Sequence, residues 1–107
     1  MTLLHTTTIG EGQPQVALVH GFTQTSNSML PLATTISSRY TVQLVDAPNH
    51  GGSTEVSLDC SAGADALCAT VGDATYIGYS MGARLCLHAA LQHPKQVKAL
   101  VLISGTA

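Results

Sequence analysis

Short apolar runs alternate along this chain with polar stretches that contain glycine. Runs rich in β-branched and other apolar residues predict strands, and the wider apolar spacing between them predicts helices. We expect strands at residues 3–9, 15–20, 40–46, 74–79 and 97–103. We expect helices at residues 29–37, with Pro31 in the first turn, from a Ser57 or Asp59 cap to about Val71, and at residues 81–93.

This alternation of strands and helices predicts the fold class. It is typical of right-handed βαβ units, in which helices cover both faces of a parallel sheet. The run at residues 15–20 is apolar almost throughout, as in a strand buried on both faces. We therefore expect an α/β fold, a parallel-sheet three-layer α/β/α sandwich. Residues 1–107 are expected to be the N-terminal part of a single domain, truncated after the strand that follows the helix at 81–93, with the cap and C-terminal part absent.

Composition narrows the classes of function. Charged residues make up 9% of the 107 residues, the net charge is −2 and the pI is about 6.1. No Lys or Arg cluster is present, which argues against a nucleic-acid or anionic-membrane surface. The N-terminus lacks the basic and apolar regions of a signal peptide, and no apolar run is long enough to span a bilayer.

Cysteine and glycine spacings exclude several cofactor sites. The three cysteines, Cys60, Cys68 and Cys86, have neither metal-ligand nor CxxC spacing, and eight helical residues would separate the first two too far for a disulfide. We expect reduced thiols in a cytoplasmic protein. No dinucleotide or P-loop glycine motif is present, so neither a cofactor nor a metal is expected.

The segment GYSMG is the strongest candidate for chemistry. It places Ser80 between Gly78 and Gly82, after a predicted strand and before a predicted helix. A serine at such a sharp turn is exposed, and glycines two residues away let the strand and the helix approach closely. Because N–H groups at a helix N-terminus favour negative charge, the Met81 N–H can stabilise an oxyanion. The pattern favours Ser80 as a nucleophile, and the alternative is a serine that merely caps the helix.

A second group of residues follows the strand at 15–20. The sequence His20-Gly21-Phe22 lies at its carboxyl end, and the Phe22 N–H is the candidate second oxyanion donor. We expect His20 to hold this loop by hydrogen bonds rather than to act as the base.

The loop DAPNHGGS, residues 46–53, follows the next strand. Ligand sites in open α/β sheets gather at the carboxyl ends of strands, so this loop is expected near the site. We interpret Asp46, His50 and Gly51 as residues that shape the loop rather than react.

Together, HGFT, DAPNHGGS and GYSMGAR resemble the oxyanion motif, the D-x-P-G-H-G-x-S loop and the nucleophile elbow of the α/β-hydrolase superfamily. The resemblance covers nearly the whole chain. It implies that Ser80 is the nucleophile and that the Phe22 and Met81 N–H groups form the oxyanion hole. Within the superfamily, HGFT with GYSMGxR is most similar to the 2-succinyl-6-hydroxy-2,4-cyclohexadiene-1-carboxylate synthases, lyases of menaquinone biosynthesis that eliminate pyruvate. That family has a Tyr and an Arg where this chain has Tyr79 and Arg84, which implies that these residues bind substrate.

Arg84 also has a physical reason to face an anion. A cation in the first turn of a helix lies at the unfavourable end of the helix dipole, so an anionic partner is expected. A substrate carboxylate and a carboxylate of the protein itself are both open.

Three functions are therefore considered: the pyruvate-eliminating lyase, a carboxylic-ester hydrolase of the same superfamily, and a non-catalytic fragment or binding protein. In the family the nucleophile is followed by an Asp or Glu and then by a His, which would lie beyond Ala107. We expect the isolated chain to show little turnover. Its expected partners are a small-molecule substrate, with a carboxylate-bearing one as a candidate, and the missing C-terminal part or a complementing chain.

Overall fold

The computed structural model describes residues 3–13, 15–21, 26–48, 51–53 and 59–103. Within these residues five strands form one sheet in the order β1-β3-β2-β4-β5. The strands are β1 (Thr6–Ile9), β2 (Val16–Val19), β3 (Val42–Val45), β4 (Ala74–Tyr79) and β5 (Val97–Ile103). All five predicted strands are thus confirmed, and the ranges of β4 and β5 coincide with the prediction.

The helices also follow the sequence prediction. A short 3-10 helix, η1 (Ser26–Met29), leads into α1 (Leu30–Ile36); α2 (Cys60–Val71) and α3 (Met81–Gln92) follow, and η2 (Gly51–Ser53) lies between β3 and α2. Pro31 lies in the first turn of α1, as expected. Asp59 is the N-cap of α2, because its side chain accepts a 2.7 Å hydrogen bond from the Ala62 N–H. Ser57, the alternative cap, is outside the described residues.

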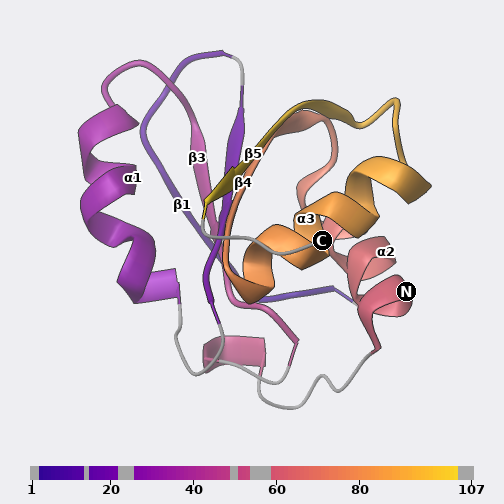
Figure 1. Ribbon diagram of the computed structural model, residues 1–107. Helices are drawn as coiled ribbons and strands as arrows, with labels where there is room; N and C mark the ends of the chain where they lie inside the picture. The colour runs from indigo at the N-terminus through magenta and orange to yellow at the C-terminus, as the bar shows by residue number, and fades with distance from the viewer. Residues whose placement is uncertain (1–2, 14, 22–25, 49–50, 54–58, 104–107) are drawn as a thin grey trace.

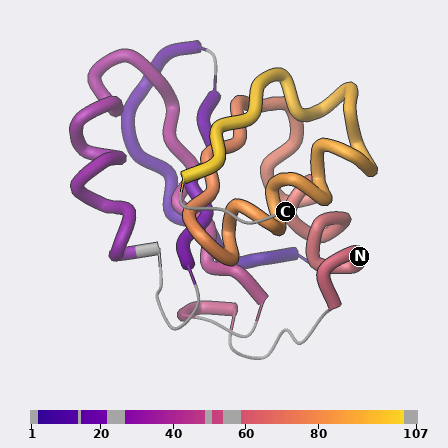
Figure 2. The backbone as a smooth tube through the Cα atoms, in the orientation of Figure 1, coloured from indigo at the N-terminus to yellow at the C-terminus, as the bar shows by residue number. Residues whose placement is uncertain are grey.

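Helices cover both faces of the sheet (Figure 1). The helix α1 lies on one face, and α2 and α3 lie side by side on the other, as the tube in Figure 2 also shows. Two apolar cores correspond to these two interfaces, one centred on α2, α3 and the sheet and the other between η1, α1 and the sheet. The three-layer sandwich is therefore confirmed. None of the helices in the described ranges combines the length and apolar character that a membrane crossing requires.

The sheet is mostly parallel, as predicted, and one strand departs from that direction. Strand β1 pairs antiparallel with β3, whereas β2 pairs in parallel with both β3 and β4, and β4 with β5. The reason lies in the connection between β1 and β2, residues 10–15. A parallel crossover needs roughly a dozen or more residues, so this short connection can only reverse the chain.

The parallel strands bring the candidate site residues together at the edge of the sheet that is formed by the carboxyl ends of these strands. Strands β2, β3 and β4 run in the same direction, so His20, Asp46 and Ser80, which directly follow them, lie at the same edge. All four residues of β2 are buried, as expected for a central strand covered on both faces. The end of β5 also supports this edge, because the Ser80 N–H donates a 2.9 Å hydrogen bond to the carbonyl of Ile103.

Candidate active site

Ser80 occupies a backbone conformation that L-residues rarely adopt. Its φ is 55° and its ψ is −111°, and it alone has a positive φ among the described residues other than glycine. The two flanking glycines explain how the turn fits: a Cβ on Gly78 would overlap the backbone of Gly82 and Ala83, and one on Gly82 would overlap the carbonyl of Val19. The spacing G-x-S-x-G therefore reflects two close backbone approaches around a strained serine.

The serine does not serve as an ordinary helix cap. Ser80 is at the N-cap of α3, but its side chain makes no capping hydrogen bond, and only its backbone carbonyl accepts hydrogen bonds, from the N–H groups of Ala83 and Arg84. A capping serine has an extended backbone and bonds the helix with its hydroxyl. The Ser80 side chain therefore lacks the hydrogen bond and the backbone conformation of a capping serine.

The N–H of Met81 lies at the N-terminus of α3, where an oxyanion donor is expected. Met81 is the first residue of α3, so its N–H has no acceptor within the helix. Within the described part of the chain, no hydrogen bond from this N–H is found either. The second candidate donor, the N–H of Phe22, lies outside the described residues, as does His50.

A cavity of about 250 Å³ opens between the loop after β3 and the N-termini of α2 and α3. Ala47, Pro48 and Leu85 form apolar walls, and Met81 places the cavity next to the elbow. Cys60, Asp59 and Arg84 also line it. The carboxylate of Asp59 is engaged by the Ala62 N–H at the cap of α2. The cavity therefore combines apolar walls with one cationic side chain, Arg84, and one acidic side chain, Asp59.

Arg84 reaches this cavity from the first turns of α3, and its side chain is exposed. None of the ion pairs among the described residues involves its guanidinium. Among the described carboxylates, Asp59 lines the same cavity as Arg84 but forms no ion pair with it. Tyr79, the other residue implied to bind substrate, is 36% exposed at the end of β4.

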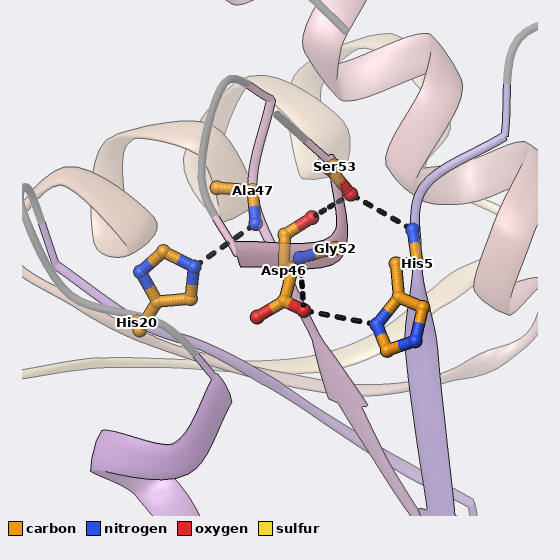
Figure 3. A network of polar contacts seen from close by, with 6 residues as sticks. All are labelled: His5, His20, Asp46, Ala47, Gly52 and Ser53. Carbon is orange, nitrogen blue, oxygen red and sulfur yellow. Dashed lines mark hydrogen bonds and ion pairs between the residues drawn. The ribbon is translucent and has the colours of Figure 1, made fainter. Parts of the chain in front are cut away.

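His20 is fully buried and joins the loops after β2 and β3 (Figure 3). Its Nδ1 lies 2.8 Å from the carbonyl of Gly21, and its Nε2 lies 3.0 Å from the N–H of Ala47. A carbonyl only accepts and an N–H only donates, so Nδ1 carries the proton and Nε2 accepts. Because that lone pair is used by the Ala47 N–H, His20 holds the loops and is not placed to act as a base toward Ser80.

Asp46 is the centre of a second set of contacts in the same view (Figure 3). Its side chain is 5% exposed, and one oxygen, Oδ2, lies 2.9 Å from Nδ1 of His5 and accepts a 3.0 Å hydrogen bond from the N–H of Gly52. Its backbone carbonyl accepts a 2.8 Å hydrogen bond from the hydroxyl of Ser53. A Cβ on Gly51, where φ is 48°, would overlap the Asp46 carboxyl group, so the carboxylate and the glycine together fix the path of this loop.

No base for Ser80 is found in the described part of the chain, where no histidine contacts its hydroxyl. His88 lies eight residues along α3, about 12 Å down the helix axis. The ring of His93, at the C-cap of α3, is bonded to Asp65 at 2.6 Å.

Sequence reasoning missed the contribution of His5. It lies just before β1, 41 residues from Asp46, and no local motif contains both residues. The only available signal was Ser53 at the end of DAPNHGGS, whose hydroxyl bonds the His5 N–H at 2.8 Å. That signal could have indicated a backbone partner, but not which one.

The three cysteines are all free. Cys60 and Cys68 both lie on α2, which is the arrangement that the argument against a disulfide between them assumed. Among the described residues, no group of three or more His, Cys, Asp or Glu side chains is arranged to hold a metal.

Residues 14–107 match the family model described as alpha/beta hydrolase fold. The chain belongs to this family. It is 35% identical over 99 residues to a pimeloyl-[acyl-carrier protein] methyl ester esterase of Chromobacterium violaceum, covering 91% of this chain and 39% of the relative. A protein of the same name from Shewanella woodyi is 35% identical over 104 residues, covering 96% of this chain and 40% of the relative.

Solved structures agree with this assignment. An E-2-(acetamidomethylene)succinate hydrolase matches with a TM-score of 0.82 and 32% identity, covering 96% of this chain and 41% of that one. An esterase from a marine microorganism has the same fold, with a TM-score of 0.85 at 22% identity, covering 95% of this chain and 41% of that one. The chain spans about two fifths of the length of the curated relatives that it matches.

Proposed function

We propose that the protein that carries this chain hydrolyses carboxylic esters, with Ser80 as the nucleophile. The observation that carries the proposal is the elbow: a strained serine without a capping bond, at a helix N-terminus and beside a cavity. Curated relatives are named for methyl-ester hydrolysis. They support the carboxylic-ester hydrolase, which the sequence offered as an alternative, more than the pyruvate-eliminating lyase of menaquinone biosynthesis.

In the proposed reaction, the Ser80 oxygen attacks the ester carbonyl carbon as its proton passes to a base. The negative charge that develops on the carbonyl oxygen is stabilised by the Met81 N–H and, as the sequence motif predicts, by the Phe22 N–H. The alcohol leaves with a proton, and water then hydrolyses the acyl-serine. By the order typical of the family, an Asp or Glu and a His from a later segment supply the base. This chain is then the nucleophile-bearing part of a single domain.

The cavity supports an ester whose acyl chain carries a second, anionic group. Apolar walls from Ala47, Pro48 and Leu85 suit methylene groups, and Arg84 suits a carboxylate at the far end. One relative is named for the hydrolysis of a succinate derivative. Tyr79 is proposed to contact the substrate beside the serine. The free thiols support the reducing environment of a cytoplasmic protein.

The test uses the product of the complete reading frame that encodes this chain. Hydrolysis of monomethyl pimelate is compared with that of methyl heptanoate, a neutral ester of the same acyl length. Ser80→Ala should abolish both activities, whereas the exposed Ser38→Ala should change neither. A folded protein that hydrolyses neither ester, or does so equally well without Ser80, would contradict the proposal and favour the non-catalytic alternative. Pyruvate release from the synthase substrate, measured in parallel, would instead favour the lyase.

Arg84→Ala separates the substrate class from the reaction. A charge-assisted hydrogen bond contributes about 1.5–3 kcal/mol when it is well protected. Because Arg84 is exposed, we expect the lower end of this range, roughly a tenfold rise in KM for monomethyl pimelate. The KM for methyl heptanoate should not change. An equal effect on both esters would show that Arg84 does not recognise the carboxylate.

A further inference from the structure

His5 makes three contacts with the loop that follows β3. Its N–H donates to the hydroxyl of Ser53 at 2.8 Å, its carbonyl accepts from the N–H of Asp46 at 2.9 Å, and its ring Nδ1 lies 2.9 Å from Oδ2 of Asp46. The two backbone contacts would be kept with almost any residue at position 5. The ring contact is the part that requires a histidine.

The chemistry of the partner fixes the donor in this ring contact. Ionised Asp46 can only accept hydrogen bonds, so Nδ1 of His5 carries a proton whether the imidazole is neutral or charged. The side chain of His5 is 51% exposed, and that of Asp46 is 5% exposed. The ring therefore closes the solvent side of a nearly buried carboxylate. A Cβ on Gly52 would overlap the His5 ring, so the loop is packed directly against it.

Asp46 connects this contact to the proposed active site. The next two residues, Ala47 and Pro48, form a wall of the cavity beside Met81. The N–H of Ala47 also donates to His20, whose other ring nitrogen bonds the carbonyl of Gly21. Figure 3 shows this continuous chain of contacts from His5 through Asp46 and Ala47 to His20. The carboxylate is thus held at one end of a chain whose other end is the loop of the oxyanion motif.

We propose that His5 is a positioning residue for ester hydrolysis: its imidazole holds the Asp46 carboxylate, and so fixes the Ala47–Pro48 wall and the His20–Gly21 loop. This inference rests on the proposed function of Ser80. His5 is not among the residues that line the cavity, so its imidazole acts through its hydrogen bond to Asp46. The effect is expected mainly in kcat, because misplaced oxyanion donors weaken the transition state more than the bound ester.

The test compares His5→Ala with His5→Asn in the product of the complete reading frame. The Asn side-chain N–H₂ can donate to Asp46 from nearly the place of Nδ1, whereas Ala cannot. We expect His5→Ala to lower kcat for methyl heptanoate about tenfold, with less than a threefold change in KM, and His5→Asn to restore most of it. His93→Ala is the matched control, since His93 also pairs with an aspartate, Asp65, but lies away from the cavity; its kcat should be unchanged.

Amide hydrogen exchange supplies a readout that does not depend on catalysis. In His5→Ala, the Ala47 amide should exchange at least tenfold faster than in the wild type and in His5→Asn. The proposal would be overturned if folded His5→Ala had the kcat of the wild type and the same Ala47 exchange rate. It would also be overturned if His5→Ala and His5→Asn lost kcat to the same extent. If the wild type shows no Ser80-dependent hydrolysis, the proposed function fails, while the exchange of Ala47 still decides whether His5 positions the loop.

Discussion

Replacing Ser80 with glycine should stabilise the folded chain while removing the proposed nucleophile. The comparison that isolates the backbone is Ser80→Gly against Ser80→Ala, because both variants lack the hydroxyl. They differ in the Cβ, which is unfavourable at the φ of 55° and ψ of −111° that this turn imposes. Glycine adopts this conformation readily.

The expected difference follows from two opposing terms. A non-glycine residue held in a sparsely populated region costs on the order of 1–3 kcal/mol. Glycine gives the unfolded chain more conformational freedom, which costs the folded state about 0.4–1 kcal/mol. The balance leaves Ser80→Gly about 1 kcal/mol more stable than Ser80→Ala. In a complete domain of the length of the curated relatives, of which this chain spans about two fifths, that corresponds to roughly 2–4 °C in Tm.

Ser37 supplies a matched control. At the C-cap of α1, its φ is −67° and its ψ is −15°, an ordinary helical conformation. Ser37→Ala and Ser37→Gly both lose the hydroxyl bond to the carbonyl of Thr34. The backbone at Ser37 is not strained, so the two variants differ mainly in the conformational freedom of the unfolded chain, which glycine increases. Ser37→Gly should therefore be less stable than Ser37→Ala by up to about 1 kcal/mol. Urea denaturation of the four variants measures both differences.

The prediction depends on the sign of the difference in stability between Ser80→Gly and Ser80→Ala. If Ser80→Gly were equally or less stable than Ser80→Ala while the Ser37 pair behaved as expected, the turn at Ser80 would not be strained. The structural basis for assigning the nucleophile would then be lost. Neither variant should retain ester hydrolysis, so a gain in stability would accompany a complete loss of function.

Two further predictions concern titratable groups. The hydrogen bond from His93 lowers the pKa of Asp65. A carboxyl group whose pKa is lower in the folded state stabilises the fold at pH values above its unfolded pKa. This stabilisation is lost as the pH falls through the folded pKa. His93→Ala should therefore lower the urea midpoint at pH 5 but not at pH 2; the same difference at both pH values would contradict this. Burial raises the pKa of the Cys68 and Cys86 thiols, so iodoacetamide at pH 8 should modify half-buried Cys60 well before either of them, as mass spectrometry of peptides would show. Equal labelling rates for the three would contradict the packing of α2 and α3.

Local features of the sequence determined most of the fold and the position of the elbow. Strands and helices could be predicted because the signals that specify them are local. Examples are apolar periodicity, Asp59 at the N-cap of α2 and the glycine at its C-terminal end. The spacing of the glycines around Ser80 is enough to indicate a close approach of β4 and α3, which the structure contains. The antiparallel β1 was predictable in principle from its short connection to β2, since a turn of that length cannot support a crossover.

Only the tertiary structure decided how distant residues meet. His5 reaches Asp46 because β1 pairs with β3 at the edge of the sheet, and strand order is not contained in the periodicity of either strand. The cavity likewise exists only once α2, α3 and the loop after β3 are packed together, which brings Arg84 into the same cavity lining as Ala47 and Pro48. The sequence by itself indicated Ser80 as the candidate nucleophile. Packing over long sequence separations decided what surrounds it, because contacts between elements depend on the whole arrangement of the sheet rather than on any one segment.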